Sequence, residues 1–302
     1  MKIAITGTNG FLGQHLARLL LKEGHQIVAI AKGNDRTLCS ESTHYKYYEV
    51  DITDRVELLT VVEKERPDAF VHSAAITQPD ECELNQEICE KVNVLGTINS
   101  VFAAEQYCKH FIFISTDFVF DGEKGNYSEE DSIKPISFYG QSKSAGEKLV
   151  RDSKMPWAII RTCLVYGNAL TGTRNNIISW VKQSLEQNKP IKVVSDQVRT
   201  PTYVEDLAKG ILLIIEKKAD GIYHISGKDV LTPFEMAIRT ADYFGLDKQL
   251  IEKVDASIFV QPAKRPPKTG FDISKARKEL GYEPMGFEEG LRKMGENVNR
   301  EA

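Results

Sequence analysis

The sequence predicts a doubly wound α/β fold, in which helices cover both faces of a parallel sheet and a smaller C-terminal lobe lies at its edge. Through the first half of the 302 residues, apolar runs of strand length alternate with runs of helical period. Such alternation is typical of a parallel sheet built from β-α-β units. After about residue 165 the alternation becomes irregular, which indicates a second and smaller unit.

The elements of the first half follow from local patterns. Leu12, Leu16, Leu19 and Leu20 recur at helical spacing, and the helix that precedes Pro67 should end there because a residue before proline disfavours helix. In chain order we expect strands at 2–6, 26–31, 45–50, 69–72, 111–115 and 157–161, and helices at 11–23, 54–65, 80–108 and 137–151.

The second half yields fewer regular elements. We expect helices at 173–186, 204–215, 233–244 and 274–280, strands at 191–194 and 222–225, and a proline-rich loop at 261–268. The predicted division assigns residues 1–165, with about 200–225, to a cofactor-binding domain. It assigns about 166–199 and 226–302 to the lobe that would bind substrate.

Composition excludes several classes of protein. The chain has 39 Lys plus Arg and 43 Asp plus Glu, a net charge of −4, which argues against nucleic acid or an anionic membrane as the partner. No apolar run reaches the roughly 18 residues of a membrane span. The chain opens directly on a strand pattern, and its five cysteines form no CxxC, so we expect a cytoplasmic protein with free thiols. The six histidines show no metal-ligand spacing, so no metal site is expected.

A glycine-rich turn joins the first strand to the first helix. The run Gly7-Thr8-Asn9-Gly10-Phe11-Leu12-Gly13 spells GxxGxxG. In this context the glycines allow a tight turn, a close approach of the backbone to a pyrophosphate, and close packing of helix on strand. The unpaired N–H groups of the helix N-terminus favour the phosphates. The turn therefore predicts a dinucleotide cofactor.

The end of the second strand indicates which dinucleotide is used. An acid there binds the ribose of NAD, whereas a cation accommodates the 2′-phosphate of NADP. Lys32 stands at that position with Arg36 close behind, and Asp35 is the competing acid several residues past the strand. We expect NADPH to be preferred, with NAD as the alternative. Lys32 and Arg36 as ordinary surface charges would be the simpler interpretation.

A tyrosine and a lysine lie four residues apart on a predicted helix. Tyr139 and Lys143 would share one helix face, where the ammonium should lower the pKa of the phenol. Such a phenol can protonate a carbonyl oxygen while hydride reaches the carbon. Ser115 and Thr116 end the preceding strand, and strand ends line the ligand crevice of such sheets. Thr116 can hydrogen-bond the same substrate oxygen.

Together these motifs resemble a known family. GxxGxxG with Tyr139-x-x-x-Lys143 is similar to the extended short-chain dehydrogenase/reductases, a superfamily of the Rossmann fold. Ser115-Thr116-Asp117-Phe118-Val119-Phe120-Asp121-Gly122 and Tyr139-Gly140-Gln141-Ser142-Lys143 resemble the dTDP-4-dehydrorhamnose reductases. Further matches in the same order cover nearly the whole chain.

The resemblance implies a role for each matching residue. Thr116, Tyr139 and Lys143 match the family's catalytic triad, and Asp117, Phe118, Arg199 and Arg265 match positions at the substrate. The implied cofactor contacts are Gly7, Asn9, Gly10, Phe11, Leu12, Gly13, Lys32, Asp51, Ile52, Ala74, Ala75, Ile76, Asn93, Ser115, Tyr139 and Lys143. The implied reaction is reduction of a 4-keto nucleotide sugar by NADPH, in a protein that can form a homodimer.

Two departures leave alternatives open. Phe118 replaces the family's usual tyrosine, and it lacks the acid that a dehydratase needs there. Arg199 stands where the reductases often have glycine; Gln197-x-Arg199 resembles nucleotide-sugar epimerases, whose arginine binds the diphosphate. The 197–208 segment also resembles the regulatory β subunit of methionine adenosyltransferase. An epimerase and a non-catalytic NADP-binding regulator therefore stay as alternatives, and a surface ion pair is the simpler role for Arg199.

Overall fold

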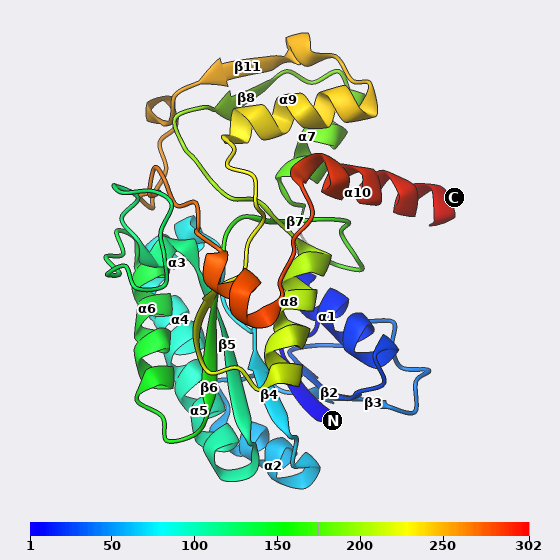
Figure 1. Cartoon of the computed structure of the whole chain (residues 1–302), viewed down its shortest axis with the longest axis vertical. Helices are drawn as coiled ribbons and strands as arrows, with labels where there is room; N and C mark the ends of the chain where they lie inside the picture. Colours follow the sequence, from blue (N-terminus) through cyan, green and yellow to red (C-terminus); the bar gives the residue numbers. More distant parts are fainter. Residues whose placement is uncertain (174, 302) are drawn as a thin grey trace.

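The computed structural model describes residues 1–173 and 175–301, and a seven-stranded sheet forms its centre (Figure 1). All neighbouring strands are parallel, in the order β10-β6-β5-β4-β1-β2-β3. The strands are β1 Lys2–Thr6, β2 Gln26–Ala31, β3 Tyr45–Glu49, β4 Ala69–His72, β5 His110–Thr116, β6 Trp157–Thr162 and β10 Gly221–His224. The order reverses between β1 and β4, so a ligand crevice is expected at their carboxyl ends.

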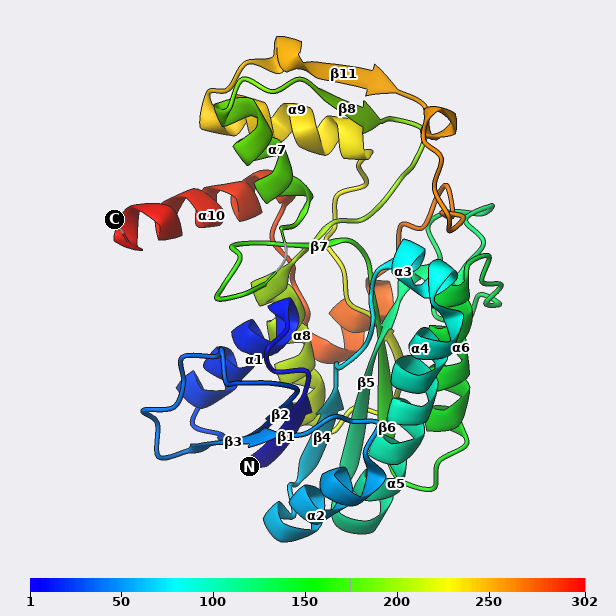
Figure 2. The same ribbon diagram turned by 180° about the vertical axis from the view of Figure 1, so that it is seen from behind.

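Helices cover both faces of this sheet. On one face α1 (Phe11–Lys22) packs against α8 (Val204–Lys217) over a core that includes Leu16 and Ile211. The opposite face carries α2 (Arg55–Glu65), α5 (Gly96–Tyr107) and α6 (Phe138–Arg151) over a second core (Figures 1 and 2). This arrangement confirms the predicted doubly wound parallel fold.

A second group of elements stands beyond the carboxyl ends of the strands (Figure 1). Its two-stranded parallel sheet pairs β8 with β11, and its helices α7 and α9 enclose a separate apolar core with them. The short parallel pair β7 and β9 lies between this lobe and the main sheet (Figures 1 and 2). The bounds are β7 Val165–Tyr166, α7 Ile177–Glu186, β8 Ile191–Val194, β9 Thr202–Tyr203, α9 Pro233–Phe244, β11 Ile251–Val254 and α10 Phe287–Glu301. Short 3-10 turns lie at Asp117–Val119, Lys248–Leu250 and Ala256–Ile258.

The long helix predicted at 80–108 is wrong as a single element. Asn85, with φ −130° and ψ 59°, ends α3 and begins α4, so the chain bends there. A π-helical turn then replaces one stretch of α-helix. The pieces are α3 Pro79–Leu84, α4 Gln86–Glu90, the π turn Lys91–Leu95 and α5 Gly96–Tyr107. By contrast, α6 (Phe138–Arg151) runs as predicted, with Ser137 capping its N-terminus.

Some C-terminal residues differ from the predicted division. Phe271 and Tyr282, assigned to the lobe, are buried in the core of the main sheet with the π turn Ala276–Leu280. Short strands such as β7 and β11 escaped prediction because two to four residues carry too little periodic signal. The predicted helix at 173–186 includes residue 174, which lies outside the described residues, and α7 itself begins after its cap, Asn176. The exact domain boundaries stay a prediction.

Candidate active site

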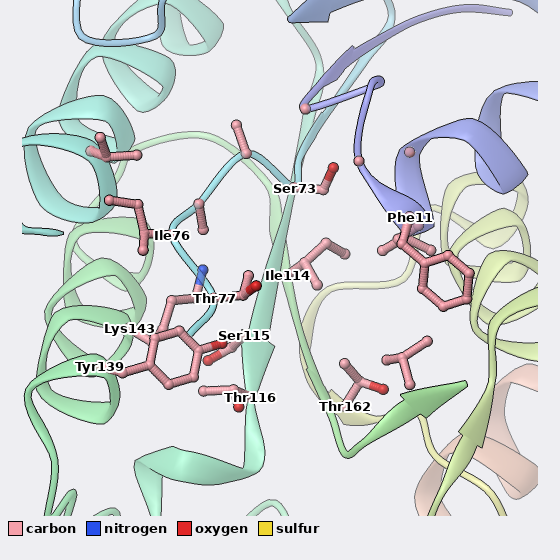
Figure 3. A pocket seen from close by; sticks show the side chains of 18 of the residues that line it. Phe11, Ser73, Ile76, Thr77, Ile114, Ser115, Thr116, Tyr139, Lys143 and Thr162 are labelled. Atoms are coloured by element: carbon pink, nitrogen blue, oxygen red, sulfur yellow. The ribbon is translucent and has the colours of Figure 1, made fainter. Parts of the chain in front are cut away.

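A cavity of about 1120 Å³ opens at the carboxyl ends of the central strands, between the sheet and the lobe. Its volume slightly exceeds the range of about 300–1,000 Å³ usual for a single ligand, so it has room for a cofactor beside a substrate. It is lined by every predicted site residue except Asn93, and Figure 3 shows ten of its lining side chains by name. Predicted site residues that lie far apart in the sequence therefore meet at this one cavity.

The glycine turn forms one wall of this cavity. Gly7 has φ +74°, and a Cβ there would lie 2.8 Å from the backbone of Ala74, so only glycine fits. A Cβ on Gly13 would lie 2.3 Å from the carbonyl oxygen of Gly7. Gly10 is the N-cap of α1 and supplies no capping side chain, and the first turn holds no acid. The first N–H groups of the helix are therefore available, which fits a pyrophosphate.

The end of the cavity beside β2 is held by side chains that bind the backbone. Asn9 Nδ2 donates to the carbonyl oxygens of Lys32 (3.1 Å) and Asn34 (2.9 Å), while its Oδ1 accepts from the backbone N–H of Arg36 (2.9 Å). Lys32 Nζ lies 3.1 Å from Asp51 Oδ2, and their side chains are 83% and 37% exposed. Two cations therefore stand beside this end, as a 2′-phosphate would require.

Asn93 is the one predicted site residue that does not line the cavity, and its contact with the cofactor stays a prediction. It is buried behind Ile76, where its Oδ1 accepts from the backbone N–H of Ile76 (2.8 Å) and its Nδ2 donates to the carbonyl oxygen of Ile76 (3.0 Å). The same Nδ2 lies 3.0 Å from Ser142 Oγ on α6. Asn93 thus fixes the segment that follows β4, and this segment forms the cavity wall.

Thr116, Tyr139 and Lys143 lie together on the opposite wall (Figure 3). Thr116 ends β5, and α6 carries Tyr139 and Lys143 on one face; all three are less than 8% exposed. The Phe118 ring meets the Tyr139 ring edge-on, with 5.6 Å between centroids. Phe118 therefore gives the tyrosine an apolar neighbour.

Burial dominates the electrostatics of this wall. It raises the pKa of Tyr139, an effect that the Thr116 hydroxyl opposes and the Asp117 charge supports. Burial also lowers the pKa of Lys143 to about 8. The lysine ammonium lies 4.1 Å from the centroid of the Phe113 ring, and no described carboxylate lies within ion-pair distance. The pKa of Tyr139 is thus raised in this structure rather than lowered as expected, and desolvation by burial is the largest cause. Tyr139 keeps its proton.

Ser115 lines the cavity, but its hydroxyl donates a hydrogen bond to a buried protein side chain rather than into the cavity. Its Oγ donates to Glu147 Oε1 at 2.6 Å, and Glu147 also accepts from Arg161 Nε at 2.9 Å and Nη2 at 2.8 Å. This buried group joins β5, α6 and β6. It fixes the helix that carries Tyr139 against the strand that carries Thr116.

Asp117 and Arg199 meet where the lobe reaches the sheet. Asp117 Oδ1 accepts from Thr116 Oγ1 at 3.1 Å, and its Oδ2 accepts from Thr269 Oγ1 and lies 3.8 Å from Arg199 Nε. Arg199 Nη1 donates to the carbonyl oxygens of Val198 (2.8 Å) and Pro267 (3.1 Å). Both charged side chains are at most 5% exposed. Arg199 is therefore part of a buried group rather than a surface ion pair.

Several polar lining residues were not predicted. Ser73 and Thr77 flank the predicted 74–76 segment after β4, and Thr162 ends β6. Their position at the carboxyl ends of strands could have indicated them. Gln197 lines the cavity beside Arg199 and accepts from its Nη2 at 3.2 Å. Among the described residues, no group of three or more His, Cys, Asp or Glu could hold a metal ion, and no helix is long and apolar enough to cross a membrane.

Comparisons with known proteins bear on this site. The family model described as "RmlD substrate binding domain" matches residues 1–300. The probable low-salt glycan biosynthesis reductase Agl14 of Haloferax volcanii is 30% identical over 291 residues, covering 95% of each chain. Methionine adenosyltransferase 2 subunit beta of Rattus norvegicus is 29% identical over 280 residues, covering 91% of this chain and 81% of the relative. The crystal structure of dTDP-4-dehydrorhamnose reductase from Bacillus anthracis in complex with NADP superposes with a TM-score of 0.86 at 29% identity, covering 98% of this chain and 99% of that one.

Proposed function

The chain belongs to the RmlD substrate-binding-domain family, and from this premise we propose that it reduces the C4 keto group of a nucleotide sugar with NADPH. It is an NADP-dependent oxidoreductase of the extended short-chain dehydrogenase/reductase superfamily, similar to dTDP-4-dehydrorhamnose reductase. The observation that carries the reaction is the burial of Thr116, Tyr139 and Lys143 together on the wall of the cavity that holds the glycine turn.

Each residue of the proposed catalytic group has a separate task. Tyr139 keeps its proton in this structure and donates it to the keto oxygen, so the phenol O–H bond breaks as the product O–H forms. The Lys143 ammonium, charged below a pKa of about 8, stabilises the phenolate that remains. Thr116 holds the same oxygen. Bound NADPH supplies the hydride to C4.

The remaining walls have binding roles in this proposal. The N–H groups of α1 take the pyrophosphate of the cofactor, Lys32 its 2′-phosphate, and Asp51 and Ile52 its adenosine. Asp117 and Phe118 face the sugar, and Arg199 and Arg265 lie toward its diphosphate. NAD is the weaker alternative cofactor, since no acid stands in place of Lys32.

The test is turnover on defined substrates. NADPH oxidation is measured with dTDP-, UDP-, GDP- and CDP-linked 4-keto sugars, each supplied separately. We expect oxidation with at least one, and the dTDP compound should be the best substrate. The absence of oxidation with every compound, in a protein that binds NADPH, would contradict the reductase.

Two alternatives predict different outcomes in the same assay. A regulatory subunit, which the similarity to methionine adenosyltransferase 2 subunit beta favours, should bind NADPH and consume none of it. An epimerase should interconvert a nucleotide sugar without net consumption of cofactor. The apolar Phe118 beside Tyr139 disfavours a dehydratase, which needs an acid there.

We also propose a cytoplasmic homodimer that binds neither nucleic acid nor membrane. All five cysteines are free thiols. Ile88, Leu95, Ile98 and Phe102 are exposed large apolar side chains at helical spacing along α4, the π turn and α5, and such a stripe favours contact with a second copy. Light scattering on the purified protein should give twice the mass of one chain. Phe102→Glu should then yield monomers.

A further inference from the structure

An ion pair joins the lobe side of the cavity to the first turn of α3. Arg265 Nη1 donates to Asp80 Oδ1 at 2.6 Å, and Nη2 donates to Asp80 Oδ2 at 2.6 Å. Asp80 Oδ1 also accepts from the backbone N–H of Ala263 at 3.0 Å, and Arg265 Nη1 donates to the Ala263 carbonyl oxygen at 2.7 Å. Three of these hydrogen bonds join two parts of the chain about 185 residues apart, and the fourth fixes Arg265 within its own loop.

The hydrogen-bond donors of Arg265 are only partly used. A guanidinium has five N–H donors. The Nη1 pair goes to Asp80 and Ala263, and one Nη2 hydrogen goes to Asp80. No described residue accepts from Nε or from the second Nη2 hydrogen. These two lie on one edge of the planar group, and such an edge matches a phosphate in a bidentate manner.

Arg199, which also lines the cavity, uses its hydrogen-bond donors differently. Both of its Nη1 hydrogens are used by backbone carbonyls, one Nη2 hydrogen goes to Gln197, and its Nε faces the Asp117 carboxylate. It offers no complete edge to an anion. Arg265 therefore has the better geometry for a phosphate group.

We propose that Asp80 is a positioning residue for substrate binding, because it fixes Arg265 so that the free guanidinium edge can take the diphosphate of the nucleotide sugar. This inference rests on the proposed function, since it assumes a diphosphate at this end of the cavity. Arg265 lines the cavity and its side chain is 17% exposed, whereas Asp80 is 38% exposed.

Two effects of the Asp80 charge oppose one another. The carboxylate repels a diphosphate, but water screens that repulsion because the group is more than one-third exposed. Its contacts also hold a long side chain and its loop in one geometry, which lowers the entropy cost of binding. Arg265 keeps the pKa of Asp80 below its ordinary value, so the pair is charged at neutral pH. We expect the positioning effect to be the larger.

The experiment measures dTDP affinity by calorimetry and steady-state kinetics on the full chain. Asp80→Asn keeps the shape of the side chain and removes the charge and one acceptor. We expect the Kd for dTDP and the KM for the nucleotide sugar to rise about five- to tenfold, with kcat and the Kd for NADPH unchanged. Arg265→Lys should give a similar rise, and the double variant should not exceed the larger single effect, because both act through one contact.

A matched control separates this from a general structural effect. Asp68 is a carboxylate of similar exposure, 31%, that pairs with Lys109 and accepts from the backbone N–H of Lys2, outside the cavity. Asp68→Asn should leave all four constants unchanged. Unchanged or tighter dTDP binding by Asp80→Asn would overturn the positioning role while the proposed function stands. A wild-type protein that binds NADPH but no dTDP, UDP, GDP or CDP would overturn both.

Discussion

Two lysines at opposite ends of one cavity differ in almost every physical respect. Lys32, at the end beside β2, is 83% exposed and lies 3.1 Å from Asp51. Lys143, on the wall with Tyr139, is 4% exposed, and its ammonium contacts the face of an aromatic ring. Water screens the first charge, so its interactions are weak. The second charge is desolvated, so it destabilises the fold, and in the proposed reaction it acts more strongly than a screened charge would.

The difference teaches how the cavity divides its work. In the proposed function, many small contacts at the exposed end add up to recognition of the cofactor, and the loss of each has a modest cost. At the buried end, the proposal assigns the proton transfer to a few groups. Substitutions at the two ends should therefore differ in the size of their effects.

Replacing Tyr139 by phenylalanine should have the largest effect. The ring stays in its packing with Phe118, and only the proton donor is lost. General acid catalysis contributes about 10²–10⁴-fold, so kcat should fall by that factor. The Kd for NADPH, measured by fluorescence, should stay within twofold. Near-full activity in this variant would show that the proton comes from another group.

Replacing Lys143 by methionine should separate function from stability. Turnover should be lost, because no cation then stabilises the phenolate. The free energy of unfolding should nevertheless rise by about 1–3 kcal/mol at pH 7, since a buried charge without a carboxylate partner is replaced by an apolar chain of similar length. Urea unfolding of both proteins measures this. A destabilised variant would mean that Lys143 has a stabilising partner.

The buried lysine should also set a pH dependence. Its pKa of about 8 lies below its unfolded value, so the native state carries the cost of the charge at low pH. Between about pH 8 and 10.5 the unfolded chain holds a proton that the native state has lost, and stability therefore rises with pH. Over the same limb kcat/KM should fall as Lys143 loses its charge, while Tyr139 stays protonated. Constant kcat/KM from pH 7 to 10 would contradict this assignment.

Replacing Lys32 by alanine should have the smallest effect. Because the side chain is exposed, its contact with a 2′-phosphate is worth about 1 kcal/mol, or about fivefold in the Kd for NADPH. Binding of NADH should not change. Lys109→Ala, at a side chain that is 82% exposed and also pairs with an aspartate, is the matched control and should alter neither. Tighter binding of NADH than of NADPH by the wild-type protein would contradict the cofactor preference.

The sequence by itself determined the parallel sheet and most of the cavity. Strands such as β1 and β2 begin and end where predicted, because short apolar runs between turns are local signals. The glycine turn was also predictable, since the need for its glycines comes mainly from the backbone geometry of a seven-residue segment. Tyr139 and Lys143 needed only the helical repeat to share a face.

Only the tertiary structure decided how those residues are used. The direction of the Tyr139 pKa depends on burial between helix and strand, which a spacing of four residues does not contain. Asn93 matched a motif, yet packing placed it behind Ile76 rather than in the cavity. Arg199 and Arg265 are both cations in the sequence. Each guanidinium has five N–H donors, and partners brought from elsewhere in the chain use them differently. Arg265 keeps one edge of two donors free, whereas Arg199 does not.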